Sequence, residues 1–510
     1  MTISFLGAAG TVTGTKHLIT LDDGRRILLD CGLFQGMGNH TASLNSTFGF
    51  DPAELHAVLL SHAHIDHSGL LPKLVADGFR GKIFCTRPTR ELTEILLMDS
   101  AQIQAHASRD PDRQTCNHAS PDPNPQTCSH ATPDPDQQTC YTEEDVKLTM
   151  DRMTDVEFDR WFEPLDNVRV FYTRTGHLAG AAAIYVDLPA AHGRTSIAFS
   201  GDVGRATHPL WRPATEFPQA DYLLLESTYG DRDHNLLLSN VDILLGHIRK
   251  TCLGKKGKLV IPAFSVGRTQ ELLYVLRQLE AENRLPDLQY FVDSPLGIAA
   301  TRVLAAQTTE YVDKLQQELG EGQDPFGFKG LKYVEATEDS IRLREYQEPC
   351  VIIASSGTAD AGRVRFHIRD VVGDPRHTIL FSGYCGLQSL GGVLLSGKKK
   401  IDFEGQEYEV KAAVKQLRGL SAHGDANDLC KFIGCQDPSL VRGVYIIHGE
   451  RHARERLSAR LKAKGFYPVN TPEMHESVVL NRHAAPPPPA AAASQLLKAI
   501  EETASAVPGS

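Results

Sequence analysis

Four potential metal ligands stand within six residues, directly after a short apolar run. The string H-x-H-x-D-H, formed by His62, His64, Asp66 and His67, follows Val58-Leu59-Leu60. In an extended loop, residues i and i+2 point to the same side, so His62 and His64 can hold one ion while Asp66 and His67 face a second. Imidazole and carboxylate groups are common zinc ligands, and such sites can keep positions for water and substrate. The string therefore predicts a metal centre on a loop that follows a strand.

Length and composition bound the class of protein. At 510 residues the chain exceeds the usual size of a single hydrophobic core, so we expect at least two domains. A hydrophobic content of 41% and a charged content of 23% are ordinary for a soluble globular protein. The net charge of -10 argues against a broad basic surface that binds nucleic acid non-specifically, but it leaves room for a narrow positive channel.

The cysteines and the N-terminal residues bear on the compartment. Ten cysteines without a C-x-x-C pair fit a reducing environment, and the first residues show neither a basic start nor a long apolar run. No apolar run is long enough to span a bilayer. We therefore expect a cytoplasmic protein.

Short apolar runs of β-type composition alternate with helical patterns. Strands are expected at residues 26–30, 57–61, 168–173, 196–200, 222–226, 258–264, 351–354, 378–382 and 444–447. Apolar residues at helical spacing predict helices at 69–78 and, more clearly, at 266–283. This alternation predicts an α/β architecture with functional side chains on loops at the strand ends.

Two segments depart from this pattern. Residues 110–140 contain an imperfect 12-residue repeat rich in Pro and Asp, which favours a flexible insertion with little capacity for packing. An alternative is a small metal-binding array made of the Cys-x-His units at 116–118 and 128–130. Residues 484–510 begin with a Pro/Ala-rich stretch and are interpreted as a linker and tail.

Three further candidate ligands lie at the ends of expected strands. His177, Asp202 and His448 each follow an apolar run and have a glycine beside them, which permits a tight turn and a close approach to a ligand. A single His or Asp at a strand end is more often a turn or cap residue. Together, however, the three complete the ligand set that a dinuclear site needs.

Seven motifs in a fixed order resemble one known group. They are L-D-C-G from residue 29, S-H-A-H-I-D-H-S-G from 61, G-H-L-A-G from 176, F-S-G-D-V-G from 199, L-E-S-T-Y-G from 225, L-S-A-H-G-D from 420 and I-I-H-G-E from 446. The chain resembles the β-CASP group of metallo-β-lactamase-fold hydrolases, which includes RNase J and the endonuclease of pre-mRNA 3′ ends. The likeness covers about residues 1–480 and is greatest to the compact bacterial ribonucleases of the group.

The resemblance implies a domain plan. An αββα metallo-β-lactamase sandwich would comprise residues 1–203 and 398–483, with an α/β β-CASP domain inserted at 204–397. Residues 484–510 would follow as the tail. Substrate would lie in a cleft between the two domains.

The resemblance also implies a role for each motif residue. His62, His64 and His177 would hold one zinc ion, Asp66, His67 and His448 a second, and Asp202 would bridge both; manganese is the alternative metal. The catalytic groups would be Asp66 and three others: His423 as general acid, Glu226 as its partner, and Asp30 as the carboxylate that orients a ligand or its loop.

Three residues are candidates for phosphate contacts: Arg268, Ser356 and Ser421. Each has an equally good structural interpretation. Arg268 also fits the start of a helix, and the two serines also fit residues that satisfy turn amides. Both interpretations stay open at this point.

These features favour a zinc-dependent ribonuclease that hydrolyses single-stranded RNA by a two-metal mechanism, endonucleolytically, in RNA processing or decay. Action as a 5′-exonuclease stays open. The alternatives are a DNA-processing β-CASP nuclease, a hydrolase of small esters or thioesters, and an inactive RNA-binding scaffold subunit. The DNA branch usually has valine where this chain has His448, which favours RNA. Relatives of this group often dimerise, so a homodimer is also left open.

Overall fold

The computed structural model describes residues 1–109, 140–191, 193–234, 240–320, 324–386, 388–403, 405–417 and 421–480. The predicted insertion, except Cys140, and the predicted tail lie outside these residues. The described chain divides into two compact units, one of residues 1–233 and 423–480 and one of residues 234–422. No helix in the described ranges is long and apolar enough to cross a bilayer.

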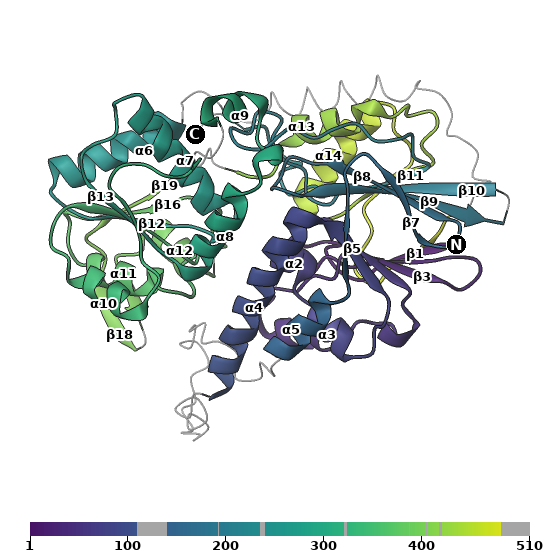
Figure 1. Cartoon of the computed structure of the whole chain (residues 1–510), viewed down its shortest axis with the longest axis horizontal. Helices are drawn as coiled ribbons and strands as arrows, with labels where there is room; N and C mark the ends of the chain where they lie inside the picture. Colours follow the sequence, from purple (N-terminus) through teal and green to yellow (C-terminus); the bar gives the residue numbers. More distant parts are fainter. Residues whose placement is uncertain are drawn as a thin grey trace. The chain divides into compact units, whose positions relative to one another are not determined.

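Two seven-stranded sheets make up the described strands of the first unit (Figure 1). The first sheet has the order β22 (Ser477–Val479), β1 (Thr2–Phe5), β2 (His17–Thr20), β3 (Arg26–Leu29), β4 (Ala57–Leu59), β5 (Lys82–Thr86) and β6 (Met153–Val156). The second has the order β21 (Val469–Asn470), β20 (Gly443–Ile446), β11 (Tyr222–Leu225), β10 (Gly193–Phe199), β9 (Ala182–Ala190), β8 (Val168–Arg174) and β7 (Trp161–Leu165).

Helices cover the outer face of each sheet, which gives an αββα sandwich. Those on the side of the first sheet are α2 (Ile65–Ser68), α3 (Leu71–Ala76), α4 (Arg87–Arg109) and α5 (Glu143–Met150). The short helix α1 (Thr41–Ser46) lies between β3 and β4 in the chain. The second sheet packs against α13 (Ala426–Phe432) and α14 (Arg451–Ala463). One apolar core fills the space between the two sheets. A second core lies between the first sheet and its helices, and a third lies between the second sheet and its helices.

The alternation of side chains along the strands explains why both faces of each sheet are apolar. In β9, Ile184 and Val186 belong to the core between the sheets, whereas Ala183 and Tyr185 belong to the core under α13 and α14. Successive residues of a strand point to opposite faces, so a strand buried on both sides favours apolar residues at successive positions. Asp187, a buried charge in β9, is paired with Arg169 and Arg194. The polar ligands are therefore confined to the loops beyond the strand ends.

The second unit is built on a six-stranded parallel sheet, as far as its described residues show. Its order is β14 (Leu331–Tyr333), β13 (Gln289–Asp293), β15 (Cys350–Ala354), β12 (Leu259–Pro262), β16 (Thr378–Phe381) and β19 (Ala413–Gln416). A hairpin of β17 (Lys400–Phe403) and β18 (Gln406–Glu409) precedes β19. The helices are α6 (Asn240–Ile248), α7 (Arg268–Ala281), α8 (Pro295–Ala305), α9 (Asp313–Leu319), α10 (Thr337–Glu345), α11 (Val364–Val371) and α12 (Leu390–Leu395).

The expected elements are present, with shifted ends. Each predicted strand is found, the helix expected at 69–78 is Leu71–Ala76, and the one expected at 266–283 is Arg268–Ala281. The limits of the units differ from the predicted domain limits at 204 and 397. Residues 204–233 lie with the first unit because β11 pairs with β10 and β20, and residues 398–417 lie with the second because β19 pairs with β16.

Candidate metal centre

The structure gathers the seven predicted ligands into two neighbouring clusters. Within each cluster the candidate ligand atoms all lie within 4.8 Å of one another. The first contains His62, His64, His177 and Asp202, and the second contains Asp66, His67 and His448. The clusters lie just beyond β4, β8, β10 and β20, so strands distant in sequence bring them together. Asp66 and His67 lie in the short helix α2, so only His62 and His64 occupy the extended loop that was predicted for the whole string.

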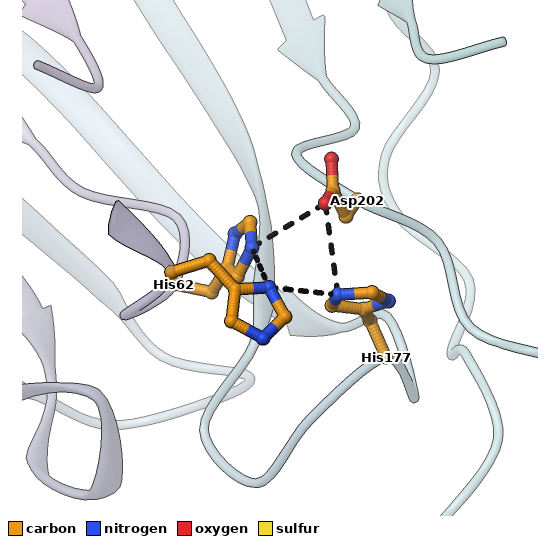
Figure 2. Close-up of side chains that lie close together, drawn as sticks. His62, His177 and Asp202 are labelled. Carbon is orange, nitrogen blue, oxygen red and sulfur yellow. Dashed lines mark hydrogen bonds and ion pairs between the residues drawn. The ribbon is translucent and has the colours of Figure 1, made fainter. Parts of the chain in front are cut away.

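The first cluster has the spacing expected around a tetrahedral ion. His64 Nδ1 lies 3.1 Å from His62 Nε2 and 3.2 Å from His177 Nε2, and Asp202 Oδ2 lies 3.4 and 3.6 Å from the same two nitrogens (Figure 2). Ligand atoms at bonds of ~2.0–2.1 Å around a tetrahedral zinc ion are roughly 3.3–3.4 Å apart. The donor set therefore fits zinc in both chemistry and spacing.

The second cluster shares Asp202 with the first. His448 Nε2 lies 3.3 Å from His67 Nε2 and 3.4 Å from Asp66 Oδ2. Asp202 Oδ1 lies 3.3 Å from His67 Nε2, while Oδ2 faces the first cluster. Oδ1 is buried and accepts no hydrogen bond from the described residues, an expensive state for a carboxylate oxygen unless a cation lies beside it. Asp202 thus offers one oxygen to each cluster.

Tight backbone contacts fix the loops that carry these ligands. A Cβ at Gly32 would lie 1.7 Å from the carbonyl oxygen of Asp66, so only glycine lets the loop after β3 approach the loop that bears Asp66 and His67. Gly201 has a positive φ of 53°, and a Cβ there would come within 2.8 Å of Ser61 Cβ. These glycines let two loops bring His67 and Asp202 together.

The imidazoles of the first cluster are held in the neutral form that binds metals. Burial lowers the pKa of His62 and holds the pKa of His177 well below its usual range. Burial, followed by the charge of His62, lowers the pKa of His64 to about 3. A neutral imidazole keeps a lone pair available for a cation, so the cluster is prepared for metal rather than for protons.

Asp30 lies behind the second cluster. His67 Nδ1 lies 2.6 Å from Asp30 Oδ2, which also accepts a hydrogen bond from Ser61 Oγ at 2.7 Å. With Nδ1 donating to Asp30, His67 turns the lone pair of Nε2 toward His448 and Asp202. Ser61 Oγ also lies 3.1 Å from His62 Nδ1, so one serine supports both clusters. The orienting role of Asp30 stays a prediction.

One supporting residue was missed in the sequence. Thr228 Oγ1 lies 3.1 Å from His448 Nδ1, which places a hydroxyl behind this ring as Asp30 lies behind His67. The parallel pairing of Leu225 in β11 with Ile446 in β20 puts the two residues side by side just beyond the strand ends. Thr228 and His448 lie at corresponding positions just after the parallel neighbours β11 and β20, and this correspondence is the signal that could have identified Thr228.

His423 and Glu226 form a pair beside the clusters. His423 Nδ1 lies 3.1 Å from Glu226 Oε1, and His423 Nε2 lies 3.7 Å from Asp202 Oδ2. The Glu226 carboxylate is fixed by the backbone amides of Val203 at 2.8 Å and Thr228 at 3.0 Å. Burial lowers the pKa of His423, but the charges of Glu226 and Asp202 outweigh it and raise the pKa to about 9.

The predicted substrate contacts belong to the second unit, and their role stays a prediction. Arg268 begins α7 and pairs with Glu271, which agrees with its structural interpretation. Ser356 Oγ accepts a hydrogen bond from the amide of Ala361 at 3.3 Å. Ser421 is buried, with 9% of its surface exposed.

Three family models match consecutive parts of the chain. The Metallo-beta-lactamase superfamily matches residues 13–104, the Beta-Casp domain residues 269–394, and the Zn-dependent metallo-hydrolase RNA specificity domain residues 407–472. Their order agrees with the order of the motifs.

Curated relatives match along almost the whole chain. Ribonuclease TTHA0252 of Thermus thermophilus is 33% identical over 465 residues, which cover 91% of this chain and 97% of the relative. Transcription termination factor FttA of Methanocaldococcus jannaschii is 28% identical over 88% of this chain and 67% of its own length. Endoribonuclease YSH1 of Yarrowia lipolytica is 27% identical over 91% of this chain and 52% of its own length. The chain therefore belongs to the β-CASP family of metal-dependent, metallo-β-lactamase-fold hydrolases.

Proposed function

We propose that this protein is a zinc-dependent endoribonuclease that hydrolyses phosphodiester bonds of single-stranded RNA. The observation that carries the proposal is the joint presence of two ligand clusters around Asp202 and the Glu226–His423 pair beside them. A dinuclear centre and a nearby proton donor are the parts that phosphodiester hydrolysis requires.

Two zinc ions are the proposed metals. His62, His64 and His177 would hold one, Asp66, His67 and His448 the other, and Asp202 both. When bound, such ions supply Lewis-acid activation of the phosphodiester and of water. Manganese is the alternative metal.

The protein's own groups position the proton. Because Glu226 engages Nδ1 of His423, the opposite nitrogen, Nε2, faces the metal clusters. From there His423 would donate a proton to the leaving ribose oxygen, and Glu226 would stabilise the imidazolium before the transfer. Asp30 would hold His67 in one tautomer throughout.

Three findings support RNA as the substrate. The relatives named above include a ribonuclease and an endoribonuclease, and residues 407–472 match an RNA specificity domain. His448 is present where the DNA-processing branch usually has valine. The complete ligand set argues against an inactive scaffold, and the large second unit argues against a hydrolase of small esters. Dimerisation and a cytoplasmic location stay predictions.

The test is cleavage of a 5′-labelled single-stranded RNA and of the matching DNA by three zinc-loaded proteins. These are wild type, His64→Ala and the exposed-histidine control His40→Ala. Internal RNA fragments from wild type and His40→Ala, but not from His64→Ala, are expected. Release of labelled mononucleotide alone would overturn the endonucleolytic mode, and preferential cleavage of DNA would overturn the choice of RNA. Failure of the zinc-loaded wild type to cleave either polymer would overturn the nuclease assignment.

A further inference from the structure

The segment that follows β11 contacts the candidate centre with successive side chains. Glu226 reaches His423, and Thr228 reaches His448. The next residue, Tyr229, has its ring centroid 6.2 Å from that of His423, with the two rings at 66°. Tyr229 therefore borders the imidazole that would deliver the proton, a position that neither its motif nor the metal chemistry explains.

Arg232 forms a layer over Tyr229. Its guanidinium carbon lies 5.6 Å from the centroid of the Tyr229 ring, within the range of cation–π contacts. Two hydrogen bonds of 2.8 Å to the Asp231 carboxylate set the plane of the guanidinium. The side chain of Arg232 is nevertheless 61% exposed. A flat cation is thus held in place over an aromatic ring while much of its surface stays in contact with solvent.

The backbone ties this layer to the segment that bears His423. The carbonyl oxygen of Arg232 accepts a hydrogen bond of 3.1 Å from the amide of Ala426, the first residue of α13. The amide of Gly230 donates to the carbonyl oxygen of Ser227 at 3.0 Å and closes the turn. The positions of Tyr229 and Arg232 relative to His423 are therefore set by the fold.

Aromatic rings and arginine guanidinium planes are the surfaces on which proteins stack single-stranded bases. A nucleotide whose leaving oxygen lies beside His423 carries its base within a few ångströms of that oxygen. The nearest flat surface from the same loop is the Tyr229–Arg232 layer. The acidic net charge of -10 makes a local stacking surface more useful, because general electrostatic attraction to RNA is weak.

We propose that Tyr229 and Arg232 form a stacking platform for the base of the nucleotide that retains the leaving oxygen. Both would contact the substrate base rather than the reacting bond, and Tyr229 also borders the imidazole of His423. The proposal rests on the function proposed above. It assigns recognition of one base, without preference for its identity, since every base has a face that can stack.

The test compares steady-state cleavage by wild type, Tyr229→Ala, Tyr229→Phe and Arg232→Gln. Each enzyme is given an intact RNA and a set of RNAs in which one abasic nucleotide is moved across the cleavage site. Loss of one stacked base typically costs about ten-fold in binding, so KM should rise about ten-fold in Tyr229→Ala and stay near wild type in Tyr229→Phe. At one position of the abasic nucleotide, the KM of wild type should rise by the same factor of about ten. The KM of Tyr229→Ala should not rise further at that position.

Trp161 on the edge strand β7 and Arg169 on the neighbouring strand β8 provide a matched control. The guanidinium carbon of Arg169 lies 5.0 Å from the centroid of the Trp161 ring. Arg169→Gln should leave KM unchanged for every substrate. Because the Arg232 side chain is exposed, Arg232→Gln should fold. It can therefore test the platform if Tyr229→Ala fails to fold.

Fluorescence anisotropy with labelled RNA, in proteins that also carry His64→Ala, measures RNA affinity without cleavage. It shows whether the effect of the abasic nucleotide depends on Tyr229 and Arg232. If the abasic nucleotide weakens RNA binding equally in wild type and in the platform variants, and wild type still cleaves RNA, the platform is overturned. Absence of RNA cleavage by wild type would instead overturn the proposed function.

Discussion

Each compact unit buries a carboxylate beside an imidazole, yet the two pairs have different surroundings. In the first unit Glu226 Oε1 lies 3.1 Å from His423 Nδ1, and in the second Asp293 Oδ2 lies 2.7 Å from His367 Nε2. Both carboxylates are fully buried. The chemistry of the pair is therefore the same in both units, and only its neighbours can give it a function.

The neighbours of Asp293 close around it. Its carboxylate also accepts hydrogen bonds from Ser340 Oγ at 2.6 Å and Arg363 Nη1 at 2.8 Å, and His367 is only 2% exposed. Ser340 on α10, His367 on α11 and Arg363 just before α11 are thereby joined to the end of β13. This pair has the features of a structural connection within the second unit.

The surroundings of Glu226 leave the second ring nitrogen of His423 directed at the metal clusters. Backbone amides fix the carboxylate, and His423 keeps 20% of its side chain exposed with Nε2 directed at Asp202. The comparison teaches that a buried carboxylate–imidazole pair acquires a chemical role when the ring's other nitrogen faces a reactive centre. Four predictions test that distinction.

The largest effect is expected from Glu226→Gln. Loss of the carboxylate charge should lower the single-turnover rate of RNA cleavage by about 10²–10⁴-fold, the usual contribution of general acid–base groups. Zinc content should stay near wild type, because Glu226 is not one of the seven candidate ligands. The melting temperature should fall, because Val203 and Thr228 donate to different oxygens of Glu226 and glutamine keeps only one acceptor oxygen. Undiminished cleavage by a zinc-loaded Glu226→Gln protein would remove Glu226 from the mechanism.

Asp293→Asn should act on folding instead. Breaking a buried ion pair by neutralising one partner commonly costs about 3 kcal/mol. Here Arg363 and His367 lose the negative charge they face, and one of the two acceptor oxygens becomes an amide nitrogen. Denaturant unfolding should show this loss in the free energy of unfolding, while cleavage by the folded fraction keeps its wild-type rate at low temperature. A full loss of activity with unchanged stability would reverse the two assignments.

Thr228→Val should weaken the second metal cluster. Removing a hydrogen-bond partner behind a ligating histidine usually costs about 10–100-fold in metal affinity, and His448 would lose the hydroxyl beside Nδ1. Competition with a zinc chelator measures this change. Thr251→Val is the matched control, since Thr251 makes a buried hydroxyl–hydroxyl bond of 2.8 Å to Thr378 in the second unit. Equal zinc affinity in both variants would show that Thr228 does not support His448.

The smallest expected effect is a change with pH in how much Asp293 stabilises the fold. Burial raises the pKa of Asp293, but hydrogen bonds from His367, Ser340 and Arg363 outweigh it and lower the pKa. A lowered pKa in the folded state stabilises the fold above the unfolded value of about 3.9, and this stabilisation is lost as pH falls through the folded pKa. The difference in melting temperature between wild type and Asp293→Asn should be constant near neutral pH and shrink below pH ~4. A difference that widens on acidification would contradict this sign.

Most of the candidate site could be predicted from the sequence because each ligand lies in a short motif next to a strand. His62, His64, Asp66 and His67 lie within six residues after β4, and the glycines beside His177 and Asp202 mark where the chain must turn closely. The helical turn α2 that carries Asp66 and His67 was not predicted. The order of the motifs then supplied the pairing of Glu226 with His423, which are 197 residues apart. The αββα sandwich and the inserted parallel sheet followed from the same family resemblance.

The remaining features depend on long-range pairing that local patterns do not encode. Thr228 supports His448 only because β11 and β20 are parallel neighbours. The limits of the two units likewise depend on the sheets that β11 and β19 join, and the limits implied by the family resemblance, 204 and 397, do not include this pairing. The layer of Arg232 over Tyr229 depends on the turn closed by Gly230 and on the hydrogen bonds from Arg232 to Asp231, and it was not visible in the sequence.

The most direct test of the account is the return of activity to metal-free protein as zinc is added. RNA cleavage and bound zinc would be measured together in each sample. The account predicts no cleavage without metal and full cleavage at about two zinc ions per chain. Cleavage by the metal-free protein, or none by protein that has bound its full zinc, would contradict it.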